Sequence, residues 1–243
     1  MRFRTYAYTN AGARANNEDA LLVRDGFWAL ADGLGGHDCG EVASNETVQY
    51  VFNRWKESGE PADELSMKKL LDSANTNLLA LQQTDSRYAA MRTTLVYAVT
   101  DGSQLCYAGV GDSRFYFFRS GRIVLQSEDH SVPAALAKMG QIPYEEIRSH
   151  EDRNKLLKVI GNSENLNLKQ LPDAVRVRPG DAFLLCSDGF WEYVYEREME
   201  IDLAKSANPK EWMGYMIKRV LLKTENKDND NFSAVCVMVS ESA

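Results

Sequence analysis

The sequence predicts an α+β fold in which two antiparallel β-sheets pack face to face, with α-helices on the outside. Two observations support this fold class. Short apolar runs come in pairs joined by turn residues, which is typical of β-hairpins and therefore of antiparallel sheet. Longer segments between the pairs carry apolar residues at helical spacing, so each has one face to bury against a sheet.

The predicted strands begin with a hairpin whose runs, 20–24 and 27–31, are joined by Asp25-Gly26. These runs are rich in Val, Leu, Phe and Tyr, which suit half-buried strands. Two further hairpins and two single strands complete the predicted set: 93–100 with 104–110, 114–119 with 122–127, 182–187, and 234–239.

Three helices are predicted between these strands. One apolar stripe runs over about 41–56, and a second runs from Met67 to Leu81. A third helix is predicted to start at Asn208-Pro209-Lys210-Glu211, which offers a capping Asn, a proline in the first turn and a Glu three residues after the cap. The polar segment 139–170 has few apolar runs, and we expect it to form a surface flap of the kind that carries specificity.

Composition favours one soluble domain over residues 1–243, because 44% of the residues are hydrophobic and 26% are charged. The net charge is −7 and Lys and Arg form no basic tract, so a nucleic-acid partner is not expected. No apolar run approaches the roughly 20 residues of a membrane span. The N-terminus lacks the apolar core of a signal peptide. We therefore expect a cytoplasmic protein with no membrane partner.

The cysteines form no CxxC pair, and none of them begins a Cys-x5-Arg phosphate loop. This excludes the mechanism of phosphatases that use a cysteine nucleophile. Four reduced, mostly buried thiols are expected instead: Cys39, Cys106, Cys186 and Cys236.

Aspartates recur at the ends of the predicted strands, and all but Asp19 stand beside glycine or asparagine. Taken singly, each is explained as a turn residue. Because five of them abut buried strands, we expect several carboxylates to converge at one edge of the packed sheets. These are Asp19, Asp32-Gly33, Asp112, Asp188-Gly189 and Asp230-Asn231.

Convergent carboxylates require cations, since two like charges about 4 Å apart repel by about 4 kcal/mol at an effective dielectric constant of 20. Oxygen ligands suit Mg²⁺ and Mn²⁺. With three histidines and no paired cysteines, zinc is the weaker alternative. Two such ions can activate a bridging water and clamp a phosphoryl oxygen. The glycine-rich segment 33–36 is explained better as a tight turn beside this site than as an anion-binding loop.

Short motifs follow one another from residue 12 to residue 239. In order they are Arg14-Ala15-Asn16-Asn17-Glu18-Asp19, Ala31–His37 with Gly40-Glu41, Thr93-Thr94-Leu95, Gly109–Arg114, Asp129-His130-Ser131, His150 to Gly161, Cys186–Glu192, and Asp230–Ser233. Their order and their residues resemble metal-dependent serine/threonine phosphatases of the protein phosphatase 2C type, bacterial branch.

The resemblance implies a central sandwich of two antiparallel sheets in a four-layer αββα arrangement, with the flap at about 139–170. It implies that two inner Mn²⁺ or Mg²⁺ ions are held by Asp19, Asp32, the Gly33 carbonyl, Asp188 and Asp230. Asp112, together with Asp188, would serve a third ion.

The resemblance also implies roles outside the metal ligands. Arg14 would bind the substrate phosphate. His37 resembles the histidine that protonates the leaving alkoxide; the alternative is a histidine behind the ligands or on the surface. Glu18 either orients water at the metals or is merely exposed, and His130 and His150 resemble structural hydrogen-bonding residues.

Two positions depart from the family pattern: Arg92 stands where glycine is usual, and Glu151 where proline is frequent. Neither is a predicted metal ligand, so the departures bear on flap conformation and substrate preference.

The implied function is hydrolysis of phosphoserine and phosphothreonine on proteins, by in-line attack of a metal-bridging water without a covalent intermediate. One alternative is a non-catalytic phosphopeptide-binding domain, against which the complete set of predicted ligands argues. The other is an enzyme for small phosphoesters. The expected partners are phosphorylated proteins, a serine/threonine kinase is expected to oppose the activity, and the chain is expected to be a monomer.

Overall fold

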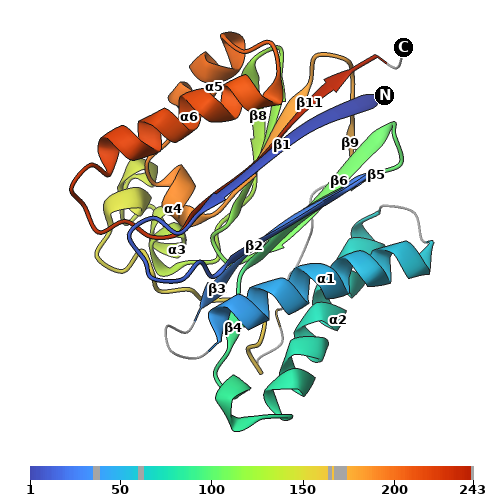
Figure 1. The fold of residues 1–243 in the computed structure, drawn as a ribbon, viewed down its shortest axis with the longest axis vertical. Helices are drawn as coiled ribbons and strands as arrows, with labels where there is room; N and C mark the ends of the chain where they lie inside the picture. The colour runs from blue at the N-terminus through green and yellow to red at the C-terminus, as the bar shows by residue number, and fades with distance from the viewer. Residues whose placement is uncertain (35–38, 60–62, 164–165, 167–173, 242–243) are drawn as a thin grey trace.

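The computed structural model describes residues 1–34, 39–59, 63–163, 166 and 174–241. Two β-sheets lie in the middle of the molecule, and helices cover both outer faces (Figure 1). The α+β sandwich predicted from the sequence is confirmed.

The first sheet has five antiparallel strands in the order β1-β11-β10-β7-β8. Its strands are β1 (Arg2–Asn10), β7 (Arg114–Arg119), β8 (Arg122–Gln126), β10 (Ala182–Cys186) and β11 (Phe232–Ser240). The two ends of the chain meet here, because β1 pairs along its whole length with β11, from Arg2 opposite Ser240 to Asn10 opposite Phe232.

The second sheet has six strands in the order β2-β3-β5-β6-β9, with β4 paired to the end of β3. Its strands are β2 (Asp19–Arg24), β3 (Phe27–Leu34), β4 (Arg92–Thr93), β5 (Leu95–Thr100), β6 (Gln104–Val110) and β9 (Val175–Arg176). All three predicted hairpins are present, and the one at β7–β8 contains a β-bulge between Phe117 and Phe118.

The predicted helices are present on the expected faces. Helices α1 (Gly40–Ser58) and α2 (Glu64–Gln82) cover the six-stranded sheet, and α6 (Pro209–Lys223) covers the other, together with α5 (Glu196–Ala204) (Figure 1). The capping side chain of Asn208 accepts a hydrogen bond from the Glu211 backbone N–H at 3.0 Å, as predicted. Four short elements complete the described set: α3 (Val132–Lys138), α4 (Asp188–Trp191), η1 (Ser86–Tyr88) and η2 (Tyr144–Ser149).

The strands bury both of their faces, so alternate residues enter different hydrophobic clusters. In β11, Val235 and Val237 lie between the two sheets, whereas Cys236 faces the helices on the outside. Between the sheets, the Trp28 ring meets the Phe183 ring edge to face, with 4.9 Å between their centroids. This aromatic packing holds the two sheets in a fixed relation.

The predicted flap overlaps the segment after α3. Its described part contains η2 and an extended stretch that hydrogen-bonds back to the start of α3 and to the residues just before it. The Leu157 N–H donates to the His130 carbonyl at 2.7 Å, and the Val132 N–H donates to the Lys155 carbonyl at 2.9 Å. Residues 164–165 and 167–173 of the predicted flap lie outside the described part of the chain.

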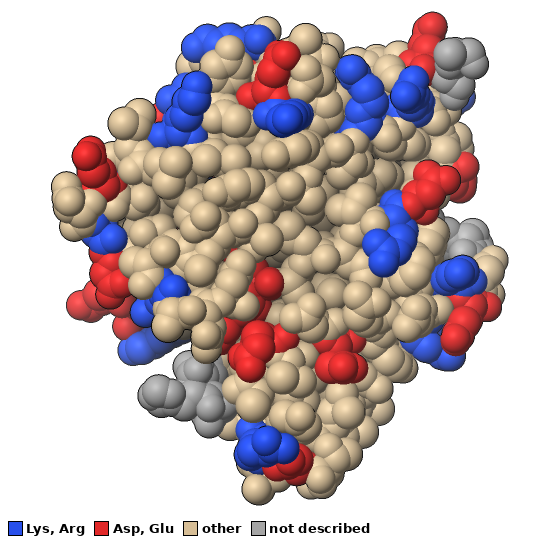
Figure 2. Space-filling model, in the orientation of Figure 1, with Lys and Arg blue, Asp and Glu red and all other residues tan. Residues whose placement is uncertain are grey.

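Surface charges agree with the sequence interpretation. On the face shown in Figure 2, Lys and Arg are interspersed with Asp and Glu and do not gather in one basic tract.

None of the helices in the described ranges combines the length and the apolarity that crossing a bilayer requires. Cys106, Cys186 and Cys236 are buried, Cys39 is partly buried, and all four are free thiols.

Candidate active site

The predicted aspartates converge at one end of the sandwich. Four of them line a single pocket of about 470 Å³: Asp32, Asp112, Asp188 and Asp230. Asp19 is buried beside them, opposite Asp32 in the β2–β3 register. The sequence therefore predicted the gathering of these carboxylates correctly, including its position at the ends of strands.

The strand register explains this convergence. Asp19 opens β2 and Asp32 lies near the end of its partner β3, which runs on to Leu34 instead of ending before Asp32. In the other sheet, Asp188 follows β10 with one residue, Ser187, between them, and Asp230 shortly precedes β11, the strand next to β10. Both sheets thus place their aspartates at the same end.

The backbone around Asp32 is fixed by hydroxyl groups at the end of β4 and at the residue between β4 and β5. The Asp32 N–H donates to Thr94 Oγ1 at 2.9 Å, and its carbonyl accepts from Thr93 Oγ1 at 2.8 Å. Thr94 Oγ1 in turn lies 2.7 Å from Ser113 Oγ, beside Asp112. These buried hydroxyl groups hold Asp32 in place without adding charge.

Two glycines let β3 and α1 approach each other closely at the site. A Cβ atom on Gly33 would lie 2.2 Å from the Gly40 carbonyl oxygen, and one on Gly40 would lie 2.0 Å from Glu18 Oε2. Neither position admits a side chain without moving the backbone or Glu18. The Gly33 carbonyl, a predicted metal ligand, is therefore part of a tightly packed wall.

Asp19 has only part of its hydrogen-bonding capacity satisfied. Its Oδ2 accepts from Ser187 Oγ at 3.0 Å, and Ser187 Oγ itself accepts from the Ser233 N–H at 3.0 Å. Its Oδ1 is buried and has no partner. Because a buried carboxylate oxygen without a partner is costly, this atom fits a ligand for a cation.

The carboxylates of this site repel one another, and their pKa values are raised. Burial, together with the charges of Asp188 and Asp230, raises the pKa of Asp19 to about 7. Burial and neighbouring aspartates also raise the pKa values of Asp32 and Asp112 well above their usual range. The pKa of Asp188 is raised by burial and by the charge of Asp230, and the charges of Asp19 and Asp188 contribute to the raised pKa of Asp32. A proton held between carboxylates is thus one way to relieve their repulsion.

The donor set fits hard divalent cations. Across the described ranges, no group of three or more His, Cys, Asp or Glu side chains already encloses a position for a metal ion. The fit rests on chemistry instead: only oxygen donors converge, they repel one another, and Asp19 Oδ1 is buried without a partner. Cations would supply the missing counter-charge.

Arg14 lies at the mouth of this pocket. Its Nε and Nη2 donate to the two carboxylate oxygens of Asp230 at 3.1 and 3.0 Å, and half of its side-chain surface is exposed. The hydrogen bond and the charge of Asp230 raise the pKa of Arg14 further, so it is a permanent cation. It accordingly places a positive charge at the pocket that the aspartates line.

The other predicted residues have mixed outcomes. His37 lies outside the described residues, as do Gly35 and Gly36. His150 Nδ1 accepts a hydrogen bond from the Asp152 N–H at 3.1 Å, which fits the structural role expected for it. His130 Nδ1 is buried without a partner, so only its backbone groups bond as expected, with its N–H on the Gly111 carbonyl at 2.8 Å.

Sequence reasoning missed the role of Asn231. Its Oδ1 accepts from the Glu18 N–H at 2.8 Å, and its Nδ2 donates to the carbonyls of Ala11 and Asn16 at 2.8 and 2.9 Å. Asn231 thereby fastens the loop that carries Arg14. The signal available in the sequence was its place directly after Asp230, where an amide can bond to neighbouring backbone.

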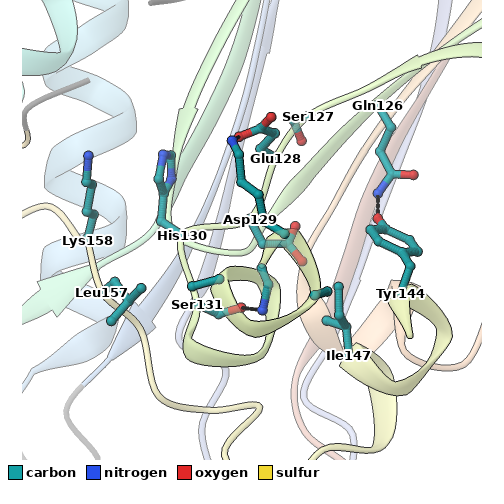
Figure 3. A pocket seen from close by; sticks show the side chains of 14 residues that line it. Gln126, Ser127, Glu128, Asp129, His130, Ser131, Tyr144, Ile147, Leu157 and Lys158 are labelled. Atoms are coloured by element: carbon teal, nitrogen blue, oxygen red, sulfur yellow. Dashed lines mark hydrogen bonds and ion pairs between the residues drawn. The ribbon is translucent and has the colours of Figure 1, made fainter. Parts of the chain in front are cut away.

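A larger pocket of about 890 Å³ lies beside this site and contains none of the converging aspartates. Its walls come from the segment before α3, from α3 itself, from η2 and from Leu157 and Lys158 (Figure 3). Because Leu156 lines the aspartate pocket and Leu157 lines this one, the segment 156–157 separates the two.

Comparison with known proteins gives a consistent result. The sequence profile described as protein phosphatase 2C matches residues 9–228. The serine/threonine phosphatase stp of Listeria welshimeri is 32% identical over 209 residues, which cover 84% of this chain and 80% of the relative.

Solved structures agree with the sequence comparisons. The serine/threonine phosphatase PstP/Ppp of Mycobacterium tuberculosis superposes with a TM-score of 0.85 at 27% identity, covering 98% of this chain and 99% of that chain. The catalytic domain of PstP in complex with two manganese ions superposes with a TM-score of 0.79 at 28% identity, covering 98% and 99%.

The repulsion at Asp188 leads to a prediction about stability. Asp188→Asn keeps the shape of the side chain and removes one charge, so in EDTA the variant should melt at or above the parent. In the parent, Mn²⁺ at about 100 times Kd should add about 2.7 kcal/mol to the free energy of unfolding. For a chain of this size, that raises the melting temperature by about 5–11 °C. In the variant, Mn²⁺ should shift the melting temperature far less. Thermal scans of both proteins, in EDTA and in Mn²⁺, measure this.

Asp181→Asn is the matched control, because Asp181 is a buried carboxylate that is already paired with Arg119 at 2.8 Å. That variant should melt below the parent in EDTA as well as in Mn²⁺. If Asp188→Asn behaves in the same way, Asp188 stabilises the fold through its own hydrogen bonds, and its place in a cation-compensated cluster is wrong.

Proposed function

Since the chain belongs to the protein phosphatase 2C family, we propose that it hydrolyses phosphoserine and phosphothreonine in proteins with the help of bound Mn²⁺ or Mg²⁺. The family resemblance identified from the sequence motifs is confirmed by that membership. The observation that supports the proposal best is the buried group of mutually repelling aspartates with a permanent cation at its mouth.

The proposed ligands follow from the carboxylates at the end of the sandwich. Two inner ions are assigned to Asp19, Asp32, the Gly33 carbonyl, Asp188 and Asp230, and a third, outer ion is assigned to Asp112 with Asp188. When bound, such ions supply an activated water for in-line attack on phosphorus and offset charge on the phosphoryl oxygens. Phosphomonoester hydrolysis is among the slowest uncatalysed reactions, so this electrostatic help is needed.

Arg14 is proposed to bind the substrate phosphate. Two of its five N–H donors are used on Asp230, and its side chain is half exposed at the mouth of the pocket. A guanidinium in that position can offer donors to phosphate oxygens while its ion pair with Asp230 keeps it oriented.

Hydrolysis should depend on metal. The parent is expected to release phosphate from a phosphothreonine peptide in Mn²⁺ or Mg²⁺ and to stop in EDTA. Iodoacetamide should have little direct effect, because no cysteine is the nucleophile, and burial raises the thiol pKa values of Cys106, Cys186 and Cys236, that of Cys106 to about 11. The measurement is phosphate release with each metal, with EDTA and after alkylation. Full activity in EDTA would show that the proposed metal mechanism is wrong.

The same assay separates the two alternative functions. Faster turnover of small phosphorylated metabolites than of phosphopeptides would favour an enzyme for small phosphoesters. Phosphopeptide binding without any hydrolysis in Mn²⁺ would favour a non-catalytic binding domain.

Arg14→Ala should mainly raise KM for a phosphopeptide, because it removes a charged contact to the ground-state phosphate as well as to the transition state. A charged hydrogen bond of about 1.5–3 kcal/mol corresponds to a loss of about tenfold to hundredfold in kcat/KM. Arg87→Ala is the control, since Arg87 forms a comparable pair with Asp85 at 2.6 Å elsewhere on the surface. Equal kinetics for the two variants would remove Arg14 from phosphate binding.

His37 is proposed as the acid that protonates the leaving alkoxide. His37→Ala should therefore lower kcat strongly on a phosphopeptide and much less on p-nitrophenyl phosphate, whose leaving group needs no proton. His150→Ala, at a histidine bonded to the Asp152 backbone, serves as the control. Equal losses on the two substrates would show that His37 does not act as the acid.

A further inference from the structure

Asp112 is connected to the helix that carries Asp188 by a single buried hydrogen bond. The indole Nε1–H of Trp191 donates to the backbone carbonyl of Asp112 at 2.9 Å. Trp191 is 2% exposed and Asp112 is 5% exposed. Because α4 runs from Asp188 to Trp191, this bond links two residues that lie 76 positions apart in the chain, Asp112 and Asp188.

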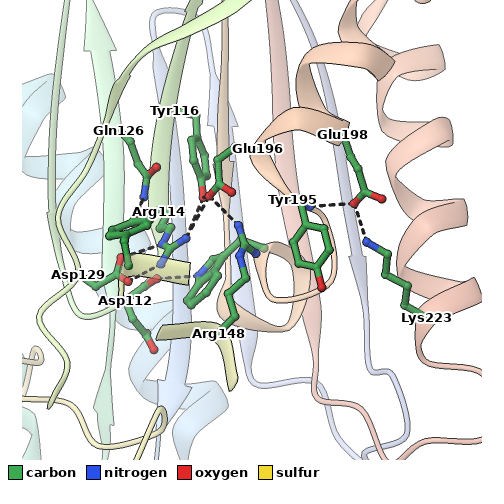
Figure 4. A network of polar contacts seen from close by, with 12 residues as sticks. Asp112, Arg114, Tyr116, Gln126, Asp129, Arg148, Tyr195, Glu196, Glu198 and Lys223 are labelled. Carbon is green, nitrogen blue, oxygen red and sulfur yellow. Dashed lines mark hydrogen bonds and ion pairs between the residues drawn. The ribbon is translucent and has the colours of Figure 1, made fainter. Parts of the chain in front are cut away.

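The indole ring itself is held by a buried ion pair. The Arg114 guanidinium carbon lies 3.4 Å from the centroid of the Trp191 ring. Arg114 is bound through two parallel hydrogen bonds to Asp129, at 2.9 and 2.6 Å, and the two side chains are 1% and 3% exposed (Figure 4). A second guanidinium, that of Arg148, lies 5.2 Å from the same ring centroid. The indole therefore packs against a guanidinium whose own position is fixed by Asp129.

The peptide on the other side of Asp112 is fixed as well. Gly111 has a φ of 98°, in the region that glycine adopts readily, and its carbonyl accepts from the His130 N–H at 2.8 Å. The turn at Gly111-Asp112 is thus held by His130 at one carbonyl and by Trp191 at the next. With both carbonyls bound, the backbone at Asp112 is held, and with it the point from which the Asp112 side chain starts.

We propose that Trp191 is a positioning residue that sets the distance between Asp112 and Asp188, and with it the affinity of the outer metal site. The Arg114–Asp129 pair keeps the indole in place for this purpose. The inference rests on the proposed function, which assigns Asp112 and Asp188 to that site. Trp191 touches neither substrate nor metal in this scheme and acts only through the peptide of Asp112.

The test compares two tryptophans that make the same kind of bond. Trp191→Phe removes the indole donor and keeps a ring beneath Arg114. Trp212→Phe makes the same change at a fully buried tryptophan whose Nε1 donates to the Met199 carbonyl at 3.1 Å, on α5 and away from the aspartates. Both variants lose one buried hydrogen bond to a backbone carbonyl, so their stabilities in EDTA should fall alike.

Isothermal titration calorimetry with Mn²⁺ gives a readout that does not depend on turnover. Trp191→Phe should weaken the weakest Mn²⁺ site about tenfold, the size typical for a partner that orients a ligand, and should leave the tighter binding unchanged. Trp212→Phe should titrate like the parent. Kinetically, Trp191→Phe should require more Mn²⁺ for half-maximal kcat, with KM for the phosphopeptide unchanged.

A double-mutant cycle then measures the coupling between Trp191 and Asp112 in Mn²⁺ binding. In an Asp112→Ala background, Trp191→Phe should have no further effect on Mn²⁺ binding, because its influence passes through Asp112. An unchanged tenfold effect in that background would overturn the inference, and so would equal weak-site affinities in Trp191→Phe and Trp212→Phe.

A second pair of variants keeps the test decisive if Trp191→Phe does not fold. Asp129→Asn loosens the clamp on Arg114, and Asp181→Asn makes the same change at the buried partner of Arg119. Only Asp129→Asn should weaken the outer site, and equal Mn²⁺ titrations would overturn the inference. If the parent itself neither binds Mn²⁺ nor hydrolyses phosphopeptides, the proposed function fails; if the parent does both, these outcomes judge the inference alone.

Discussion

Repulsion among carboxylates at one end of the sandwich is the constraint around which this molecule is organised. Asp19 and Asp32 face each other across β2 and β3, and the charge of Asp188, at the end of the other sheet, also raises the pKa of Asp32. Each like-charged pair at about 4 Å costs about 4 kcal/mol at an effective dielectric constant of 20. The site can exist only because the rest of the fold prevents these side chains from moving apart.

The fold resists that repulsion with packing and with neutral hydrogen bonds. Between the sheets, Trp28 and Phe183 are fully buried and in contact, which prevents the two layers from sliding. At the site itself, Thr93 and Thr94 fix the Asp32 backbone, and Asn231 fastens the loop before Asp19. These partners bring no cation, so they orient the carboxylates without neutralising them.

What the sequence could predict was local. The hairpin at Asp25-Gly26 and the cap at Asn208 depend on neighbouring residues, and both were predicted correctly. Strand β1 was missed because its residues alternate between half-buried and exposed along a sheet edge, which leaves no apolar run. Helix α4 has four residues, too few for a helical period to show. The hydrogen bond from Trp191 to Asp112 joins residues far apart in the chain, so no local sequence pattern predicts it.

Two kinds of buried acid within this small region make the strongest physical case for external cations. Asp129 is buried, but Arg114 neutralises it through two hydrogen bonds, so the chain itself supplies the counter-charge. Four aspartates and Glu18 line the site pocket, and among the described residues Arg14 is the only basic side chain in that lining; it bonds to Asp230 alone. The chain thus neutralises the buried carboxylate of Asp129 with its own arginine and leaves the neighbouring carboxylates without a counter-charge. The site formed by those neighbours therefore suits positive charge from outside the chain.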